Sequence, residues 1–266
     1  VLDIAAIAEV AHAHGLPLVV DNTVPSPFLC NPLALGADIV VHSATKYLAG
    51  HGTTLGGVVV EGGRFPWDNG KFPGMTEPSP GYHGVKFYET FGDFGFTMRA
   101  RMETLRVYGA ALAPTSAWQI LQGIETLPVR MERHVANARR IVAFLREQSM
   151  VASVSYPELP DHPDHALARK LLPRGCGAVF PVNLKATREQ GRKFIETLRL
   201  FSHLANVGDA KSLVIHPAST THFRMSAQDL ERAGITEGTI RLSIGLEDAD
   251  DLIEDLSRAL YAAGKA

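Results

Sequence analysis

A lysine that follows a short apolar run carries the most specific chemical signal in the sequence. Lys46 lies in the segment SATKY at residues 43–47, after the apolar residues 39–41 and before a Gly-His-Gly turn at 50–52. A lysine amine whose pKa is lowered by its surroundings can form a Schiff base. Neighbouring hydroxyls can donate to phosphate oxygens, and glycines let a backbone approach them. The segment indicates a Schiff-base lysine beside a phosphate, although a solvent-exposed lysine after a strand is equally compatible with these residues alone.

An aspartate at the end of the preceding apolar run strengthens this interpretation. Asp21 lies 25 positions before Lys46. The carboxyl ends of neighbouring parallel strands meet at one edge of a sheet, so we expect the two side chains to lie close together. Pyridoxal 5'-phosphate needs this pair, because a lysine carries its aldehyde and a carboxylate keeps its ring nitrogen protonated. Asp21 alone could equally cap the turn that begins at Asn22; together with Lys46 it favours the cofactor.

An arginine far downstream is the third candidate. Arg241 lies in the segment TIRLS at 239–243, which is otherwise apolar enough to be buried. A buried arginine needs a carboxylate or phosphate partner, and its planar fork suits the α-carboxylate of an amino acid. Taken alone, Arg241 favours the alternative of a structural ion pair with one of the four acidic residues in 247–251.

The eleven histidines do not indicate a metal site. His12 and His14 are two positions apart in an expected helix, so they point to different faces. His162 and His165 lie in a polar loop without a nearby cysteine. The two cysteines, Cys30 and Cys176, are expected to be small packing residues rather than nucleophiles.

Composition limits the class of protein that can hold these residues. The chain has 266 residues, of which 45% are apolar and 20% are charged, so it can form one large domain or two ordinary ones. Its formal charge is −2 and no block of one sign stands out, so nucleic-acid and membrane-surface binding have no electrostatic basis. No apolar run approaches the roughly 20 residues that span a bilayer. Two cysteines fit a reducing compartment, and we expect a cytoplasmic globular chain.

Hydrophobic patterning of the first hundred residues predicts an α/β fold. A helical pattern over 4–11 ends near Gly15, and short β-branched runs follow at 16–20, 38–41 and 57–60. This order predicts a largely parallel sheet covered by helices, with buried strands. Residues 62–96 are rich in glycine, proline and aromatics. A loop this long is functional or disordered, and its aromatic content argues against disorder.

The remainder of the chain predicts a second, α+β part. The pattern is helical over 97–144, and then strands are expected at 151–156, 178–182 and 239–243, with helices at 189–200 and 249–263. We therefore divide the chain into residues 1–125, which hold the lysine, and a C-terminal domain of residues 126–266.

Five segments resemble one enzyme family in sequence and in order. They are VDNT at 20–23, SATKY at 43–47, GDAKSL at 208–213, HPAS at 216–219 and IRLSIGLE at 240–247. Over residues 1 to about 263 the chain is similar to the pyridoxal-phosphate enzymes of cysteine and methionine metabolism. The resemblance implies an α/β fold-type-I transferase fold, aspartate-aminotransferase-like, with the end of the large domain followed by an α+β small domain.

The resemblance also implies roles for individual residues. Lys46 would be the Schiff-base lysine and Asp21 the partner of the pyridinium nitrogen. Ser43 and Thr45 would hold the phosphate. The substrate carboxylate would be bound by Arg241, with Ser212 and Thr221 lining that side of the pocket.

The long aromatic insert at 62–96 is similar to the O-acetylhomoserine sulfhydrylase branch, whereas shorter connections are expected of the lyases. That branch implies replacement of the acetate of O-acetyl-L-homoserine by sulfide, giving homocysteine, in a homotetramer with active sites at subunit interfaces. The alternatives are a cystathionine or methionine γ-lyase or a γ-synthase of the same family. A non-catalytic fragment that acts as an assembly partner is an alternative of another class.

Three family features have no counterpart in the sequence. They are the tyrosine that stacks on the ring, the glycine-containing phosphate loop at a helix start, and the Tyr-x-Arg segment lent by a neighbouring subunit. All lie upstream in the family, and Val1 opens directly into a helical pattern. We therefore expect a missing N-terminal segment that belongs to the same protein, and little activity from residues 1–266 alone.

Overall fold

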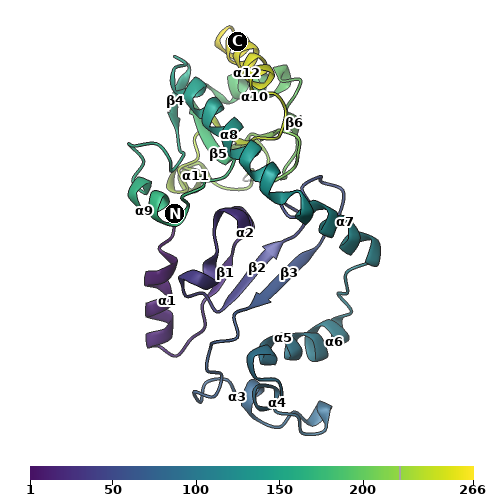
Figure 1. The fold of residues 1–266 in the computed structure, drawn as a ribbon. Helices are drawn as coiled ribbons and strands as arrows, with labels where there is room; N and C mark the ends of the chain where they lie inside the picture. The colour runs from purple at the N-terminus through teal and green to yellow at the C-terminus, as the bar shows by residue number, and fades with distance from the viewer. Residues whose placement is uncertain (222) are drawn as a thin grey trace.

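The lysine-bearing half of the chain is built on a small mixed sheet. The computed structural model describes residues 1–221 and 223–266 (Figure 1). Its first sheet has the order β1 (Val19–Asp21), β2 (Ile39–Ser43) and β3 (Gly57–Glu61). β1 pairs with β2 in parallel, but β3 pairs with β2 antiparallel. The prediction of a largely parallel sheet is therefore wrong for β3, because residues 44–56 form turns instead of the crossover helix that a parallel neighbour requires.

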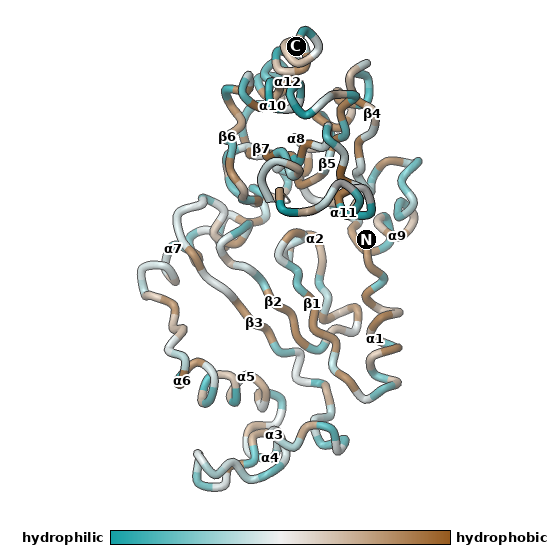
Figure 2. Tube along the Cα trace, turned by 180° about the vertical axis from the view of Figure 1, so that it is seen from behind, coloured by the Kyte–Doolittle hydropathy of each residue, from teal (hydrophilic) through white to brown (hydrophobic). Residues whose placement is uncertain are grey.

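The elements before β2 are shorter and more exposed than the pattern predicts. The opening helix is confirmed as α1 (Ile4–Ala13), and Asp3 accepts a hydrogen bond from the Ala6 N–H at its start. Hydrophobic residues run along α1 in Figure 2, but only Ala8 is buried. Val19 of β1 is 51% exposed, so the predicted buried strand at 16–20 is wrong. The reason is that β1 has a single neighbour in the described sheet. Two short helical turns, α2 (Ser26–Leu29) and η1 (Pro32–Leu35), lead to β2.

The aromatic insert is ordered around its own core, as its composition predicts. It contains α3 (Pro73–Thr76), η2 (Pro80–Tyr82), α4 (Phe87–Phe91) and η3 (Gly92–Phe94). Phe65, Trp67 and Phe87 are buried together with Ile39 of β2. Trp67 stacks on Phe96 with ring centroids 5.7 Å apart. The insert is therefore attached to the sheet by packed rings and is a part of the first half.

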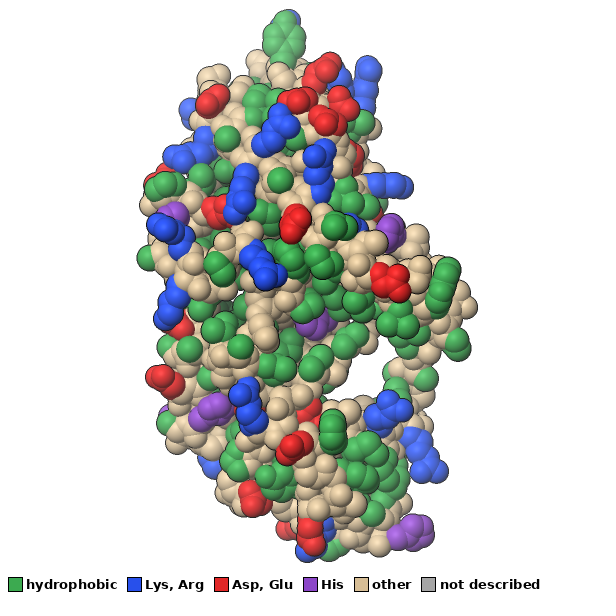
Figure 3. All heavy atoms as spheres, in the orientation of Figure 1, with side chains coloured by type: hydrophobic (Ala, Val, Ile, Leu, Met, Phe, Trp, Pro, Cys, Tyr) green, Lys and Arg blue, Asp and Glu red, His purple; other side chains and the backbone are tan. Residues whose placement is uncertain are grey.

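Helices connect the insert to the second half. They are α5 (Gly95–Arg99), the π-helical segment η4 (Ala100–Leu105), α6 (Arg106–Tyr108), α7 (Pro114–Glu125) and α8 (Leu127–Arg146). Figure 3 shows an opening through the molecule between β3 and the segment 109–113, which joins α6 to α7. Met131 and Val135 of α8 pack in the core around Tyr47, whereas Ile141 and Leu145 pack in the core of the second half. Helix α8 belongs to both cores, and the division at 125/126 falls just before it.

The second half is an α+β layer structure, as predicted. Its sheet has the order β4 (Val151–Val154), β5 (Val179–Leu184), β8 (Thr239–Ser243), β7 (Leu213–Ile215) and β6 (Ser202–His203). Helices α8, α10 (Arg188–Thr197) and α12 (Ala249–Gly264) pack together with this sheet (Figure 1). The remaining helical segments are α9 (His165–Leu171), η5 (Pro217–Ser219) and α11 (Ala227–Arg232). No helix among the described residues is long and apolar enough to cross a membrane.

Candidate active site

The ends of β1 and β2 bring Asp21 and Ser43 to one edge of the first sheet. Asp21 lies opposite Val41 in the parallel register. Its Oδ1 accepts from the Thr23 N–H at 3.0 Å and from the Thr23 hydroxyl at 2.5 Å. The Ser43 N–H in turn donates to Thr23 Oγ1 at 2.8 Å. Thr23 therefore fixes the Asp21 carboxylate to the end of β2, and no hydrogen bond from the described residues reaches the other carboxylate oxygen.

Lys46 follows in a tight turn after β2. The Lys46 N–H donates to Ser43 O at 3.1 Å, and the Gly50 N–H donates back to Lys46 O at 2.8 Å. Thr45 is held against the start of β3, since its hydroxyl accepts from the Gly56 N–H at 3.1 Å and donates to Gly56 O at 3.3 Å. The turn presents the half-buried Lys46 amine to the second half of the molecule, where it donates to Asn206 Oδ1.

Asn206 also contacts Arg241. Its backbone carbonyl accepts from Arg241 Nη2 at 3.2 Å, while its side chain accepts from Lys46. Arg241 is half-buried in β8, and burial lowers its guanidinium pKa. The Lys46 amine, which follows β2 of the first sheet, and the Arg241 guanidinium of β8 therefore both bind Asn206.

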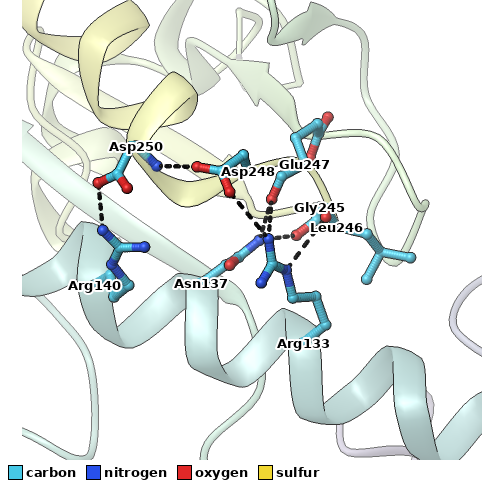
Figure 4. A network of polar contacts seen from close by, with 8 residues as sticks. All are labelled: Arg133, Asn137, Arg140, Gly245, Leu246, Glu247, Asp248 and Asp250. Atoms are coloured by element: carbon cyan, nitrogen blue, oxygen red, sulfur yellow. Dashed lines mark hydrogen bonds and ion pairs between the residues drawn. The ribbon is translucent and has the colours of Figure 1, made fainter.

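The sequence left open that Arg241 forms a structural ion pair, and no such pair exists among the described residues. Three of the acidic residues after β8 have other partners. Glu247 accepts from Ser212. Asp248 pairs with Arg133, and Asp250 pairs with Arg140 (Figure 4). No ion pair of Arg241 is found within the described part of the chain. Its guanidinium keeps the capacity to bind a carboxylate of another molecule.

Ser212 and Thr221 are less simply placed. Ser212 is fully buried; its N–H donates to Glu247 Oε1 at 2.6 Å, and its hydroxyl donates to Glu247 Oε2 at 2.9 Å. The same hydroxyl accepts from the Gly245 N–H at 2.8 Å. These bonds join Ser212 to the loop after β8. Thr221 is exposed beyond η5. Contacts of these two residues with a substrate stay predictions.

A cavity of about 520 Å³ lies beside the lysine. Besides the predicted Thr45 and Lys46, its lining contains polar residues that sequence reasoning missed, namely Thr53, Thr54, Ser116, Gln119 and Asn206. Ser116 and Gln119 come from α7. Asn206 lies two positions before the GDAKSL segment at 208–213. Its nearness to that segment is the one feature of the sequence that could have marked it as a site residue. The hydroxyl and amide groups of this lining can form hydrogen bonds with a polar ligand.

A buried histidine next to Asp21 was also missed. His42 of β2 is 7% exposed, and its Nδ1 has no hydrogen-bond partner among the described residues. Burial lowers the pKa of His42, while the Asp21 carboxylate opposes this effect. Burial therefore favours the neutral form of the imidazole near Asp21, and a neutral ring does not offset the negative charge of the carboxylate.

The cysteines have the inert character that the sequence predicts. Burial raises the pKa of the Cys30 thiol. Burial and the nearby Glu158 carboxylate raise the pKa of Cys176 to about 11. Neither thiol is therefore activated as a nucleophile at neutral pH. Among the described residues, no group of three or more His, Cys, Asp or Glu side chains could hold a metal ion.

The donor set fits pyridoxal phosphate. The strand-end edge offers a primary amine on Lys46 and a carboxylate on Asp21, one oxygen of which accepts no hydrogen bond from the described residues. It also offers hydroxyls on Ser43 and on Thr45, the latter bonded to Gly56. These are the groups that hold the aldehyde carbon, the ring nitrogen and the phosphate of this cofactor. Arg241, which has no acidic partner in the described part of the chain, completes the set with a group for an amino-acid carboxylate.

Comparison with known proteins extends over nearly the whole chain. The chain is 52% identical to the O-acetyl-L-homoserine sulfhydrylase of Leptospira meyeri, with 97% of this chain and 61% of that protein covered. It is 48% identical to the homocysteine synthase of Schizosaccharomyces pombe, with 98% and 62% covered. The chain thus spans about three fifths of the length of the curated relatives that it matches.

A solved structure and a family model agree with these relatives. A structure described as an O-acetylhomoserine (thiol)-lyase of Campylobacter jejuni, which holds N'-pyridoxyl-lysine-5'-monophosphate, superposes with a TM-score of 0.93 at 41% identity. The superposition covers 98% of this chain and 62% of that one, which confirms the predicted fold. The model of the Cys/Met metabolism PLP-dependent enzymes matches residues 1–261. The chain therefore belongs to the family of PLP-dependent enzymes of cysteine and methionine metabolism.

Proposed function

We propose that the chain carries the lysine-bearing part of an O-acetyl-L-homoserine sulfhydrylase. This enzyme replaces the acetate of O-acetyl-L-homoserine with sulfide and releases homocysteine. The names of the relatives from Leptospira meyeri and Schizosaccharomyces pombe support the proposal. The aromatic insert, which forms a packed core on β2, supports the same branch of the family.

The observation that carries the proposal is the convergence of Lys46 and Arg241 on Asn206. An amino acid whose carboxylate binds the Arg241 guanidinium has its α-carbon one bond from that carboxylate. Because Lys46 contacts the same asparagine, its amine lies within reach of the proton on that carbon. The site is therefore arranged for chemistry that begins at the α-carbon of an amino acid.

Each residue of the site has a distinct part in this chemistry. Pyridoxal phosphate, when bound, supplies an electron sink that stabilises negative charge at the substrate α-carbon. Lys46 would hold its aldehyde carbon, and the Lys46 amine would remove the α-proton of the substrate and move protons between neighbouring carbons. The Asp21 carboxylate would keep the proton on the ring nitrogen. Arg241 fixes the carboxylate, so that acetate leaves from a γ-carbon held at a constant position.

We also propose that the protein works as a homo-oligomer, a tetramer, with sites at subunit interfaces. Helix α7 lends Ser116 and Gln119 to the cavity, and its outer side chains Trp118 and Leu121 are 60% and 59% exposed. A second copy packed over these side chains would border the cavity. Sedimentation velocity of the wild type and of Trp118→Glu tests this arrangement, since the variant is expected to shift the protein to smaller species.

A side-by-side assay tests the catalytic proposal. The purified protein is loaded with pyridoxal phosphate and given O-acetyl-L-homoserine with sulfide, methionine, or cystathionine. Homocysteine formation that requires sulfide, and that is lost in Lys46→Ala, is the expected result. Turnover of methionine or cystathionine without sulfide would identify a γ-lyase instead. Cofactor absorbance that is the same in wild type and Lys46→Ala, without turnover, would identify a non-catalytic assembly partner.

A further inference from the structure

Four polar residues form one stripe along helix α8. Arg130, Arg133, His134 and Asn137 are spaced i, i+3, i+4 and i+7, so they lie on one face of the helix. Three of them are buried, with Arg130 5%, His134 0% and Asn137 1% exposed. A buried polar stripe between two apolar cores requires partners that use its hydrogen-bonding groups. The partners of this α8 polar stripe include backbone carbonyls of the two segments that carry the site.

At one end of the stripe, Arg130 holds the Lys46 turn. Its Nη1 donates to Tyr47 O at 2.8 Å, and its Nη2 donates to Leu48 O at 3.3 Å and to Gly123 O at 2.5 Å. Residues 46–50 form a turn rather than a helix, and the Tyr47 and Leu48 carbonyls find their hydrogen-bond donor outside it. Arg130 supplies two of these partners directly after Lys46.

The packing around this contact is close at two glycines. A Cβ atom at Gly50, whose φ is +76°, would lie 2.1 Å from Arg130 Nη1. A Cβ atom at Gly123 of α7 would lie 2.4 Å from Leu48 O and 2.3 Å from Ala49 O. Both glycines therefore allow the guanidinium and α7 to lie directly against the backbone of the turn.

The other end of the stripe holds the segment that follows Arg241. His134 Nδ1 donates to Ile244 O at 2.7 Å. Asn137 Nδ2 donates to Gly245 O at 3.0 Å and to Glu247 O at 2.8 Å (Figure 4). Arg133 adds bonds to Leu246 O and Glu247 O from the same face. Helix α8 therefore binds both the Lys46 turn of the first half and the segment after β8 in the second half.

We propose that the α8 polar stripe sets the position of the Lys46 amine relative to the Arg241 guanidinium, with Arg130 as the positioning residue of the lysine. None of the ion pairs among the described residues involves Arg130; its guanidinium donates to three carbonyls and, through Nε, to the Thr126 hydroxyl. An apolar residue would fill this space without the desolvation of a cation. What it could not do is bind three carbonyls with a fixed planar geometry, and this property orients the turn.

The effect of Arg130 on turnover rests on the proposed function, whereas its effect on the position of the Lys46 amine does not. A first experiment therefore uses cofactor-free protein. Labelling of Lys46 by an amine-reactive reagent is followed by peptide mass spectrometry, with Lys185 as the internal reference because its amine is bonded to Ser149 O on a distant surface. Arg130→Met is expected to raise the labelling rate of Lys46 at least fivefold and to leave that of Lys185 unchanged. Equal rises at both lysines, or no rise at Lys46, would overturn the proposal.

A second experiment uses protein loaded with pyridoxal phosphate. Reductive trapping measures how fast the cofactor becomes attached to Lys46, and Arg130→Met is expected to slow attachment at least tenfold. Asn137→Ala at the other end is expected to raise KM for the amino acid with attachment unchanged. Arg146→Met, which removes a surface ion pair with Asp161 from the same helix, is the matched control and should match wild type.

Arg130→Lys keeps the charge but cannot hold three carbonyls at once, so intermediate labelling and attachment rates are expected. If Arg130→Met does not fold, this variant decides the question. Wild-type rates in Arg130→Lys would then overturn the proposal. If the wild type attaches the cofactor without sulfhydrylase turnover, the proposed function fails while the positioning role is still measured.

Discussion

The amine of Lys46 donates a hydrogen bond to the side chain of Asn206, 160 positions further along the chain. Lys46 follows a strand of the first sheet, whereas Asn206 lies between β6 and β7 of the second. The carbonyl of the same asparagine binds Arg241 of β8. The site is therefore formed across the boundary between the two halves, and its geometry depends on the contacts that hold the halves together.

Replacing Asn206 tests this relationship. Asn206→Ala removes the oxygen that accepts from Lys46 and leaves the backbone carbonyl that binds Arg241. A hydrogen bond from a charged group is worth about 1.5–3 kcal/mol, so kcat is expected to fall about 10- to 100-fold. KM should change little, because the carboxylate anchor is retained. Steady-state kinetics measure both constants, and Asn69→Ala, on an exposed loop, is the control. A rise in KM at unchanged kcat would contradict the prediction.

Replacing Arg241 tests the carboxylate anchor. Lysine keeps the charge but has no planar fork for bidentate binding. Arg241→Lys is expected to raise KM for the amino acid about tenfold or more, while cofactor absorbance is unchanged. Arg188→Lys, at an exposed arginine that binds a single carbonyl, should behave as wild type. Unchanged substrate affinity in Arg241→Lys would mean that this arginine has only a structural role.

Replacing Asp21 tests the partner of the ring nitrogen. Asp21→Asn retains an acceptor for the Thr23 N–H and hydroxyl but has no negative charge. Asp21→Ala removes both properties. Both variants are expected to retain cofactor attachment to Lys46 and to lose turnover by orders of magnitude, because the ring would no longer accept electrons. Reductive trapping and turnover are measured together. Near-normal turnover in Asp21→Asn would exclude the assignment.

The placements that the sequence predicted correctly follow from local rules. Asp21 and Ser43 terminate apolar runs, and the carboxyl ends of adjacent parallel strands necessarily share an edge. The burial of Arg241 follows from the apolar strand around it. Whether its guanidinium had an ion-pair partner could not be decided in this way. That depended on Arg133 and Arg140 of α8 pairing with two of the acidic residues after β8.

The residues that were missed depend on packing between distant segments. Asn206 is one polar residue in a loop, and its importance comes only from the folding of β8 and the Lys46 turn around it. Arg130 and Asn137 have the residue types of a solvent-exposed helix face. Their i, i+7 spacing was visible in the sequence, but the carbonyls that bury them belong to segments about 80 to 110 positions away. Hydrophobic patterning alone does not distinguish such a stripe from a solvated one.

The stability of the protein should depend on pH through His134. Burial lowers the pKa of His134 from 6.5 to about 4, and the nearby positive charge of Arg130 acts in the same direction. The hydrogen bond to Ile244 O and the charge of Asp209 oppose the shift. Between pH 6.5 and 4 the unfolded chain therefore binds a proton at this position that the folded protein does not bind. Because the unfolded state then binds more protons, the free energy of unfolding falls as the pH drops through this window.

The size of this effect can be measured by urea denaturation at several pH values from 7 to 4. A shift from 6.5 to about 4 corresponds to at most about 3–4 kcal/mol, since one pKa unit is worth about 1.4 kcal/mol. His42, whose pKa is also lowered by burial, contributes in the same direction.

His134→Gln retains a donor for Ile244 O but cannot be protonated, so its unfolding free energy should fall less steeply with falling pH than that of wild type. His203→Gln, at an exposed position, should keep the wild-type slope. Equal slopes in wild type and His134→Gln would show that His134 does not stay neutral in the folded protein.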